Sequence, residues 1–359
     1  MESLVHVLMV GRRFMKVFDS KPGIAEKVIQ NQIHPLLLPL AVANMEASRK
    51  EYTHQDLDEV KKLYLDVLYN PSHFTDRLKG RPNWEHRFPI KDLIRMGRVY
   101  TLIKRLTRKF SSAAWSHLSP SGEPAKLSEA EEVRFYRAFY RLELFSKLCR
   151  GDSVIGDSFL HTRSCFFLLM HAPWERGQMA CINHFWYAMC SKLVDTGEPR
   201  DYVGPFFEPV DAFRRRKFPD ALLSQGVEFW VSMLEARNPR ELATIWLTTT
   251  RKKSVRLSDM LALTCLADGY YSPWYTTGED TRKYILPNTP YDDRDPGPVR
   301  MWVRCHGWST NVFRTSIMIG REVFGRLAYL FWDEERCERE NLYRLFGYWA
   351  RLDPPNFTR

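Results

Sequence analysis

Apolar residues recur at the helical period along almost the whole of this 359-residue chain. In residues 57–68, for example, they fall at positions that share one face of an α-helix. Signals for strands are scarce, because no Asn-Gly or Asp-Gly pair stands between runs of alternating apolar residues. No period of about 34 or 40 residues repeats, which argues against a regular solenoid. The sequence therefore predicts an all-α protein, an irregular multi-helix domain of roughly ten to twelve helices with no regular repeat.

Several helix boundaries can be read from individual residues. Pro35 suits the first turn of a helix, because it has no backbone N–H to leave unpaired there. Ser128 with Glu131 three residues later forms a capping box, which predicts that a helix begins at this point. We expect further helices over 218–239, 316–337 and 338–352.

Composition and cysteine usage indicate a globular intracellular protein. Hydrophobic residues make up 44% of the chain, so a sizeable core can be buried. The seven cysteines are irregularly spaced and include no C-x-x-C pair, and no secretory segment is apparent. No apolar run approaches the ~18 residues of a membrane span. We therefore expect reduced thiols, no membrane span, and a cytoplasmic or nuclear location.

Motifs for catalysis are absent from the sequence. The chain contains no G-x-S-x-G nucleophile elbow, no phosphate-binding P-loop, no H-E-x-x-H and no dinucleotide-binding glycine fingerprint. We therefore expect a non-enzymatic protein without a cofactor. An unrecognised enzyme stays open as a third alternative, since its pocket would not be visible in the sequence.

Two clusters have the residue types of metal ligands. Cys165, His171, Cys181 and His184 supply the four sulfur and nitrogen donors that zinc takes. Their surroundings are apolar and cysteine is often buried, so we expect core residues here rather than a zinc site. The acidic run 292–295 could hold a divalent cation, but the following Pro-Gly favours a solvated turn or helix cap. We predict no metal site.

A basic amphipathic helix is the strongest local signal. Residues 91–109 contain seven basic side chains and one acidic side chain, Asp92. Such a helix can meet phosphates, an acidic peptide or a membrane surface, or it can simply present a solvated face. Five of the basic residues share a stripe about 80° wide on a helical wheel, and they are Lys91, Arg95, Arg98, Arg105 and Lys109.

Three stretches read as loops, near 115–126, 195–211 and 268–298. The third is the longest, and structureless loops of that length are uncommon unless they are functional or partly ordered. Aromatic side chains gather in it, which makes it a second candidate for binding a partner. These candidates are Tyr270, Tyr271, Trp274 and Tyr275.

Charged residues also occur in a helix that is apolar on nearly every side. Arg137, Arg141 and Glu143 lie in this helix, and such a helix is normally buried. Because a buried charge needs a partner, we predict that these residues are structural. The two arginines, one turn apart, are expected to pair with carboxylates elsewhere in the chain.

Four stretches resemble a large, mostly uncharacterised fungal family of F-box-related proteins. Residues 3–18 look like the last helix of an F-box and its continuation, and residues 34–43, HPLLLPLAVA, resemble the helix that follows in that family. Residues 134–145, RFYRAFYRLELF, and 173–181, PWERGQMAC, are similar to two further helices of the family. Each motif is short, but together they span most of the chain.

The resemblance implies an all-helical protein-interaction role. It implies an F-box-like terminal helix remnant over 1–30 and a single all-helical domain over 31–359. The first two F-box helices, which dock on the linker subunit of a cullin ubiquitin ligase, have no counterpart before Met1. We therefore expect a degenerate or truncated F-box-type substrate adaptor, in which contact with the ligase linker is in doubt.

The function expected from the sequence is thus a non-enzymatic protein-interaction module whose partner is another protein of unknown identity. The alternative is a nucleic-acid-binding helical protein that uses the basic helix 91–109. The net charge of +10 is compatible with both. Binding to nucleic acid would weaken steeply with salt, because each neutralised phosphate releases counterions.

Overall fold

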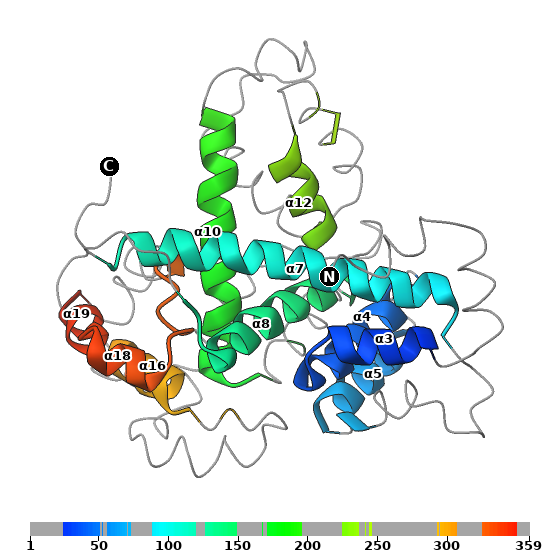
Figure 1. The fold of residues 1–359 in the computed structure, drawn as a ribbon, viewed down its shortest axis with the longest axis horizontal. Helices are drawn as coiled ribbons and strands as arrows, with labels where there is room; N and C mark the ends of the chain where they lie inside the picture. Colours follow the sequence, from blue (N-terminus) through cyan, green and yellow to red (C-terminus); the bar gives the residue numbers. More distant parts are fainter. Residues whose placement is uncertain are drawn as a thin grey trace.

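The described part of the chain is entirely helical. The computed structural model describes residues 24–50, 52, 56–69, 71–72, 88–119, 126–148, 167, 171–195, 225–236, 241, 244–245, 293, 295–306 and 325–349. Within these residues the regular elements are ten α-helices and one 3-10 helix, and no strand is formed (Figure 1). The predicted all-α class is confirmed.

The elements follow one another as α3 (Ile24–Gln32), the 3-10 helix η1 (Pro35–Leu37), α4 (Leu38–Ala47), α5 (Leu57–Tyr69), α7 (Ile90–Ser116), α8 (Glu129–Leu148), α10 (Pro173–Asp195), α12 (Val227–Glu235), α16 (Gly297–His306), α18 (Glu334–Arg339) and α19 (Leu342–Trp349). None of the described helices is both long and apolar enough to cross a membrane.

Helix α8 is the centre of the fold. Every residue from Val133 to Ser146 is buried, so the helix has no solvent-facing side over this length. Helices α4, α7 and α10 all pack against it. A helix covered on all sides can carry apolar residues at every position, which explains why α8 shows only a weak amphipathic pattern.

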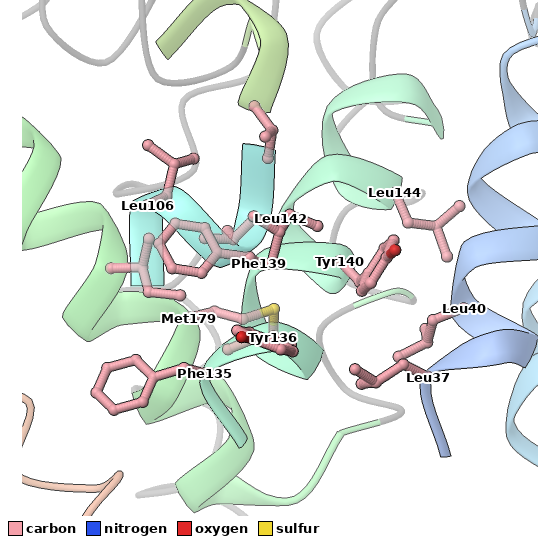
Figure 2. Close-up of a cluster of buried hydrophobic side chains, with 14 of the residues drawn as sticks. Leu37, Leu40, Leu106, Phe135, Tyr136, Phe139, Tyr140, Leu142, Leu144 and Met179 are labelled. Atoms are coloured by element: carbon pink, nitrogen blue, oxygen red, sulfur yellow. The ribbon is translucent and has the colours of Figure 1, made fainter. Parts of the chain in front are cut away.

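Aromatic and aliphatic side chains of α8 fill the space on two opposite sides of it (Figure 2). On one side Tyr140 and Leu144 face Leu40 of α4, and on the other side Phe139 lies beside Leu106 of α7. All of these side chains are almost completely buried. The core is therefore continuous across α8, and each buried side chain of this size contributes about 1.5–3 kcal/mol to folding.

Helix α7 is the longest element and runs across most of the width of the view in Figure 1. It contacts α3, α4, α8 and α12. Gly97 allows the close approach of α3, because a Cβ atom at this position would lie only 3.2 Å from both Ile29 Cδ1 and Gln32 Oε1. One face of α7 is thus held against the core along much of its length.

Helix boundaries set by local signals match the prediction. The backbone N–H of Glu131 donates to Ser128 Oγ at 3.2 Å, and the N–H of Ser128 donates to Glu131 Oε2 at 3.0 Å, which is the expected capping box. Pro35 begins a helical turn as predicted, but that turn is the 3-10 helix η1, and α4 follows from Leu38.

The C-terminal helices differ from the prediction. We expected one helix over 316–337, but the chain forms turns over 327–332 and α18 begins only at Glu334. Every side chain from Leu327 to Trp332 is at most 4% exposed, so this segment is buried on all sides rather than on one helix face. Asp333 then starts α18 by accepting a hydrogen bond from the N–H of Arg336 at 2.9 Å.

Several predicted segments lie outside the described residues. These are residues 1–23 of the F-box-like remnant 1–30, residues 120–125 of the first loop, the loop 195–211 after Asp195, and nearly all of 268–298. The last range does include the start of α16 at Gly297.

Candidate functional site

The basic residues of α7 lie together on its solvent-facing side. Lys91, Arg95, Arg98, Arg105 and Lys109, which share the predicted stripe, are all exposed. The apolar residues on the opposite side, among them Met96, Val99 and Ile103, are buried against the core. The amphipathic pattern in the sequence therefore corresponds to the actual orientation of the helix.

Arg108 is exposed as well and extends this surface. The six exposed basic residues of α7 are called the basic face from here on, and they are Lys91, Arg95, Arg98, Arg105, Arg108 and Lys109. Between Lys91 and Lys109 the single other exposed residue is Thr101. None of the exposed residues of this stretch is acidic or apolar, whereas Asp92, Ile94, Tyr100 and Leu102 are partly buried.

Most of the basic face has no counter-charge in the described part of the chain. Arg105 pairs with Glu235, at the last position of α12, but both side chains are about half exposed, 58% and 49%. Such a surface pair contributes about 0–1 kcal/mol. No described carboxylate forms an ion pair with the other five residues. Asp92, the one acidic residue nearby, is engaged by Arg49 at 2.8 Å.

At the C-terminal end of the basic face, repulsion between neighbouring positive charges affects the pKa of a lysine. The pKa of Lys109 is lowered, first by partial burial and then by the neighbouring positive charge of Arg105. Like charges at i and i+4 destabilise a helix by about 0.2–0.5 kcal/mol. By contrast, Lys50 and Arg339 elsewhere on the surface each contact two carboxylates.

The polar residues predicted inside α8 are buried and have contacts on other helices. Arg141 Nη2 donates to Glu175 Oε1 of α10 at 2.6 Å, and Arg137 Nη2 lies 3.6 Å from Asp293 Oδ2. Glu143 accepts a hydrogen bond from the backbone N–H of Val227 at 2.6 Å. These contacts join α8 to three other segments of the chain.

Arg134 makes the most extensive of these contacts, although the sequence analysis did not single it out as a site residue. Its guanidinium donates to Asp293 at 2.7 and 3.1 Å, to Asp295 at 2.7 Å and to the carbonyl oxygen of Phe331 at 3.0 Å. The signal that could have found it is its place one turn before Arg137, in a helix without a polar side. Since both described carboxylates of the acidic run hold Arg134, they serve as its counter-charges.

A second buried arginine, Arg336 of α18, was also missed. It donates to Glu131 of α8 at 2.7 and 2.8 Å, and its guanidinium lies over the rings of Trp115 and Trp332, 4.8 and 5.5 Å from their centroids. Glu131 therefore has two functions, because it belongs to the capping box and also holds the C-terminal helices. Cation–π contacts of this kind add about 0.5–2 kcal/mol.

A chain of buried polar groups links α5, α8 and α10. The hydroxyl of Tyr64 contacts His171 Nε2, and His171 Nδ1 lies 3.6 Å from Glu175 Oε2. Glu175 also accepts from the backbone N–H of Ala172 at 3.1 Å. Burial raises the pKa of Glu175, but the adjacent Arg141 charge and the contact with His171 outweigh burial and hold that pKa well below its usual range. Glu175 is thus a buried carboxylate that stays ionised.

The described members of the Cys/His cluster are spread along α10 and its N-terminal end. His171 contacts Tyr64, whereas the side chain of His184 lies next to Gly325. Cys181 is a buried free cysteine, and burial raises the pKa of its thiol. Cys165 lies outside the described residues. Among the described residues no three His, Cys, Asp or Glu side chains come together as metal ligands.

Comparison with protein-family models, with curated proteins and with solved structures finds no match for this chain. The resemblance to F-box-related proteins therefore stays a prediction that rests on the residues quoted for it. The aromatic candidates Tyr270, Tyr271, Trp274 and Tyr275 lie outside the described residues. The basic face of α7 is thus the candidate binding surface that the structure describes.

Proposed function

We propose that this chain is a non-catalytic interaction module and that the basic face of α7 is its binding surface for a negatively charged macromolecule. One observation carries the proposal. Six basic side chains share the exposed side of one helix, and among the described residues only Arg105 has a carboxylate partner. A surface that concentrates positive charge attracts acidic partners and speeds their association.

The buried polar residues support a structural rather than a catalytic role for the interior. Arg134, Arg141 and Arg336 are each held by a buried or half-buried carboxylate, and Glu143 is held by a backbone N–H and by Lys147. Buried groups that join helices through ion pairs are poorly placed to react with a substrate. The binding capacity of the described part therefore lies on its surface.

The partner expected from the sequence is another protein, and an acidic segment of that protein would fit the basic face. The adaptor role in ubiquitin ligation stays a prediction, since residues 1–23 lie outside the described residues. Nucleic acid is the second candidate, and the specific observation in its favour is the absence of exposed apolar side chains between Lys91 and Lys109. Protein interfaces usually centre on such side chains.

A charge-reversal experiment tests the proposal. Arg95→Glu with Arg98→Glu removes two positive charges from the middle of the basic face and adds two negative ones. The matched control, Lys62→Glu with Arg344→Glu, makes the same change in net charge at exposed positions on α5 and α19. Binding to fluorescent polyglutamate and to fluorescent DNA duplex is measured by anisotropy at ~50 mM salt, where polyanion binding is strong.

We expect at least one of the two polyanions to bind the natural chain and the control, and to lose at least tenfold in affinity for the charge-reversed variant. Equal binding by the variant and the control would contradict the proposal. So would a failure of the natural chain to bind either probe. Circular dichroism of each variant checks that the helical fold is retained.

A further inference from the structure

We infer that the basic face of α7 binds the phosphate backbone of a nucleic-acid duplex. This inference rests on the proposed function and narrows its partner to one class of macromolecule. It is drawn from three features of the basic face: the kinds of side chain that it exposes, the lack of exposed acidic, apolar and aromatic residues among them, and the spacing of its charges.

The exposed groups of α7 are the ones that contact phosphates. Four of the six basic residues are arginines, whose planar guanidinium donates two parallel hydrogen bonds to a phosphate. The remaining exposed residues up to the end of the helix are Thr101, Ser112 and Ser116. Arg, Lys, Ser and Thr supply most side-chain hydrogen bonds to nucleic-acid backbones. None of the exposed residues between Lys91 and Lys109 carries a carboxylate, which would repel phosphate, and the two carboxylates at the border of the basic face, Asp92 and Glu235, are paired with arginines.

An acidic peptide is a poorer match for this surface. Exposed ion pairs contribute about 0–1 kcal/mol each, so a peptide would need an apolar anchor to bind tightly. The basic face contains no exposed apolar side chain, because Leu93, Met96 and Val99 point into the core and Ile94 and Leu102 are partly buried against it. A duplex carries one charge per ~1.7 Å and gains free energy by releasing condensed counterions when its phosphates are neutralised. The same six cations therefore bind a duplex more tightly than a peptide.

A single strand is also a poorer match. Proteins that bind single strands stack the bases on exposed aromatic rings. The one aromatic residue near the middle of the basic face, Tyr100, is half-buried and its ring packs edge-on against Tyr136 at 5.6 Å between centroids. It is not free to receive a base. In a duplex the bases already stack on one another, and only the backbones need to be contacted.

The charges fall into two groups along the helix. Lys91, Arg95 and Arg98 form the first group, and Arg105, Arg108 and Lys109 form the second. The gap between Arg98 and Arg105 is about 10 Å at 1.5 Å per residue, with Thr101 between the groups. The major groove of B-DNA is ~12 Å wide. One group can therefore contact the backbone on each side of a groove while α7 lies across it.

The contacts in this arrangement are to phosphates, so the inference predicts binding with little preference for base sequence. It also predicts a salt dependence of known size. With five to six phosphates neutralised, the logarithm of the affinity for DNA should fall with the logarithm of salt concentration at a slope of about −4.5 to −5.4.

The test uses the full chain and four fluorescent probes, measured by anisotropy from ~50 to ~200 mM salt. The probes are a mixed-sequence DNA duplex, an RNA duplex, a single-stranded DNA and polyglutamate. We expect a duplex, of DNA or of RNA, to bind most tightly. For the DNA duplex, Arg95→Gln should lower the steepness of the slope by about 1. The control Lys62→Gln should leave the slope unchanged.

The outcomes separate the inference from the proposed function. The inference would be overturned if polyglutamate or the single strand bound more tightly than both duplexes. The proposed function would still stand in that case, provided that charge reversal of Arg95 and Arg98 abolished this binding. Binding of no probe would overturn both. Duplex binding with a slope near zero, or a slope unaffected by Arg95→Gln, would also overturn the inference, because phosphate neutralisation would then not be the source of affinity.

Discussion

Glu143, on α8, accepts a hydrogen bond from the backbone N–H of Val227, the first residue of α12, at a distance of 2.6 Å. The other carboxylate oxygen of Glu143 pairs with Lys147 at 3.0 Å. Gly226 brings the chain to this point with φ of 90° and ψ of −179°, a backbone conformation that is essentially restricted to glycine. Helix α12 is therefore anchored to the central helix by a buried carboxylate, and it in turn contacts α7.

Gly226→Ala should destabilise the fold. A Cβ atom at this position would lie 2.5 Å from Glu143 Oε2, and the alanine would also be forced into an unfavourable backbone conformation. We expect a loss of about 2–3 kcal/mol in the free energy of unfolding, measured by urea denaturation. Ser232→Ala, on the exposed side of α12, is the control and should change stability by no more than about 0.5 kcal/mol. An unchanged midpoint of urea denaturation for Gly226→Ala would show that the fold does not require glycine at position 226.

Arg141 and Glu175 should be strongly coupled in a double-mutant cycle. Arg141→Met removes the positive charge that faces the Glu175 carboxylate in the core, and breaking a buried pair in this way costs about 3–5 kcal/mol. Glu175→Gln alone removes the negative charge that faces Arg141, and the double variant should be more stable than the sum of the two single losses predicts. We expect a coupling free energy of at least about 1 kcal/mol in urea denaturation. Additive losses would contradict a direct interaction. Arg339→Met, which breaks an exposed ion pair, shows how much unfolding free energy is lost when such a pair is not buried.

Glu175 should also make stability fall at acidic pH. Its pKa in the folded protein lies below that of an unfolded glutamate, so its contribution is fully present above a pH of about 4.5 and is lost as the pH falls toward the folded pKa. The difference in unfolding free energy between the natural chain and Glu175→Gln should therefore shrink between about pH 6 and pH 3. A difference that stays constant over this range would mean that folding does not lower the pKa of Glu175.

Cys181 and Cys337 should be unreactive in the native protein. Both are buried, and burial raises the pKa of both thiols, so the reactive thiolate is disfavoured. Brief alkylation at about pH 8, followed by peptide mass spectrometry, should leave both cysteines unmodified until denaturant is added. Alkylation of either one at the rate of a free thiol, without denaturant, would show that the surrounding core opens readily.

The sequence was sufficient to predict features that depend on neighbouring residues. The capping box of Ser128 and Glu131 and the orientation of the basic side chains on α7 both follow from spacings of a few residues. A hydrophobic stripe has to face the core, and hence the opposite stripe has to face water. The exposed charges of the basic face were predictable for this reason.

Features that depend on distant residues were not predictable from the pattern. Arg134 and its partner Asp293 are separated by 159 positions, and Glu131 and Arg336 by 205. Nothing in the local sequence indicates which carboxylate lies near which arginine after folding. The turn at Leu327–Trp332 was missed for a related reason. Its residues are all apolar and all buried, so the segment has no amphipathic pattern that could show where a helix ends.

The two residues of each distant pair are synthesised at different times. Glu131 and Arg134 leave the ribosome well before Asp293, Asp295 and Arg336, and at about 5–20 residues per second the interval is about 10–40 seconds. During that time α4 and α7 can already cover two sides of α8, but the native partners of its charges Glu131 and Arg134 have not yet been made. The ion pairs that complete the core around α8 can therefore form only after Arg336 has been synthesised, long after α8 itself.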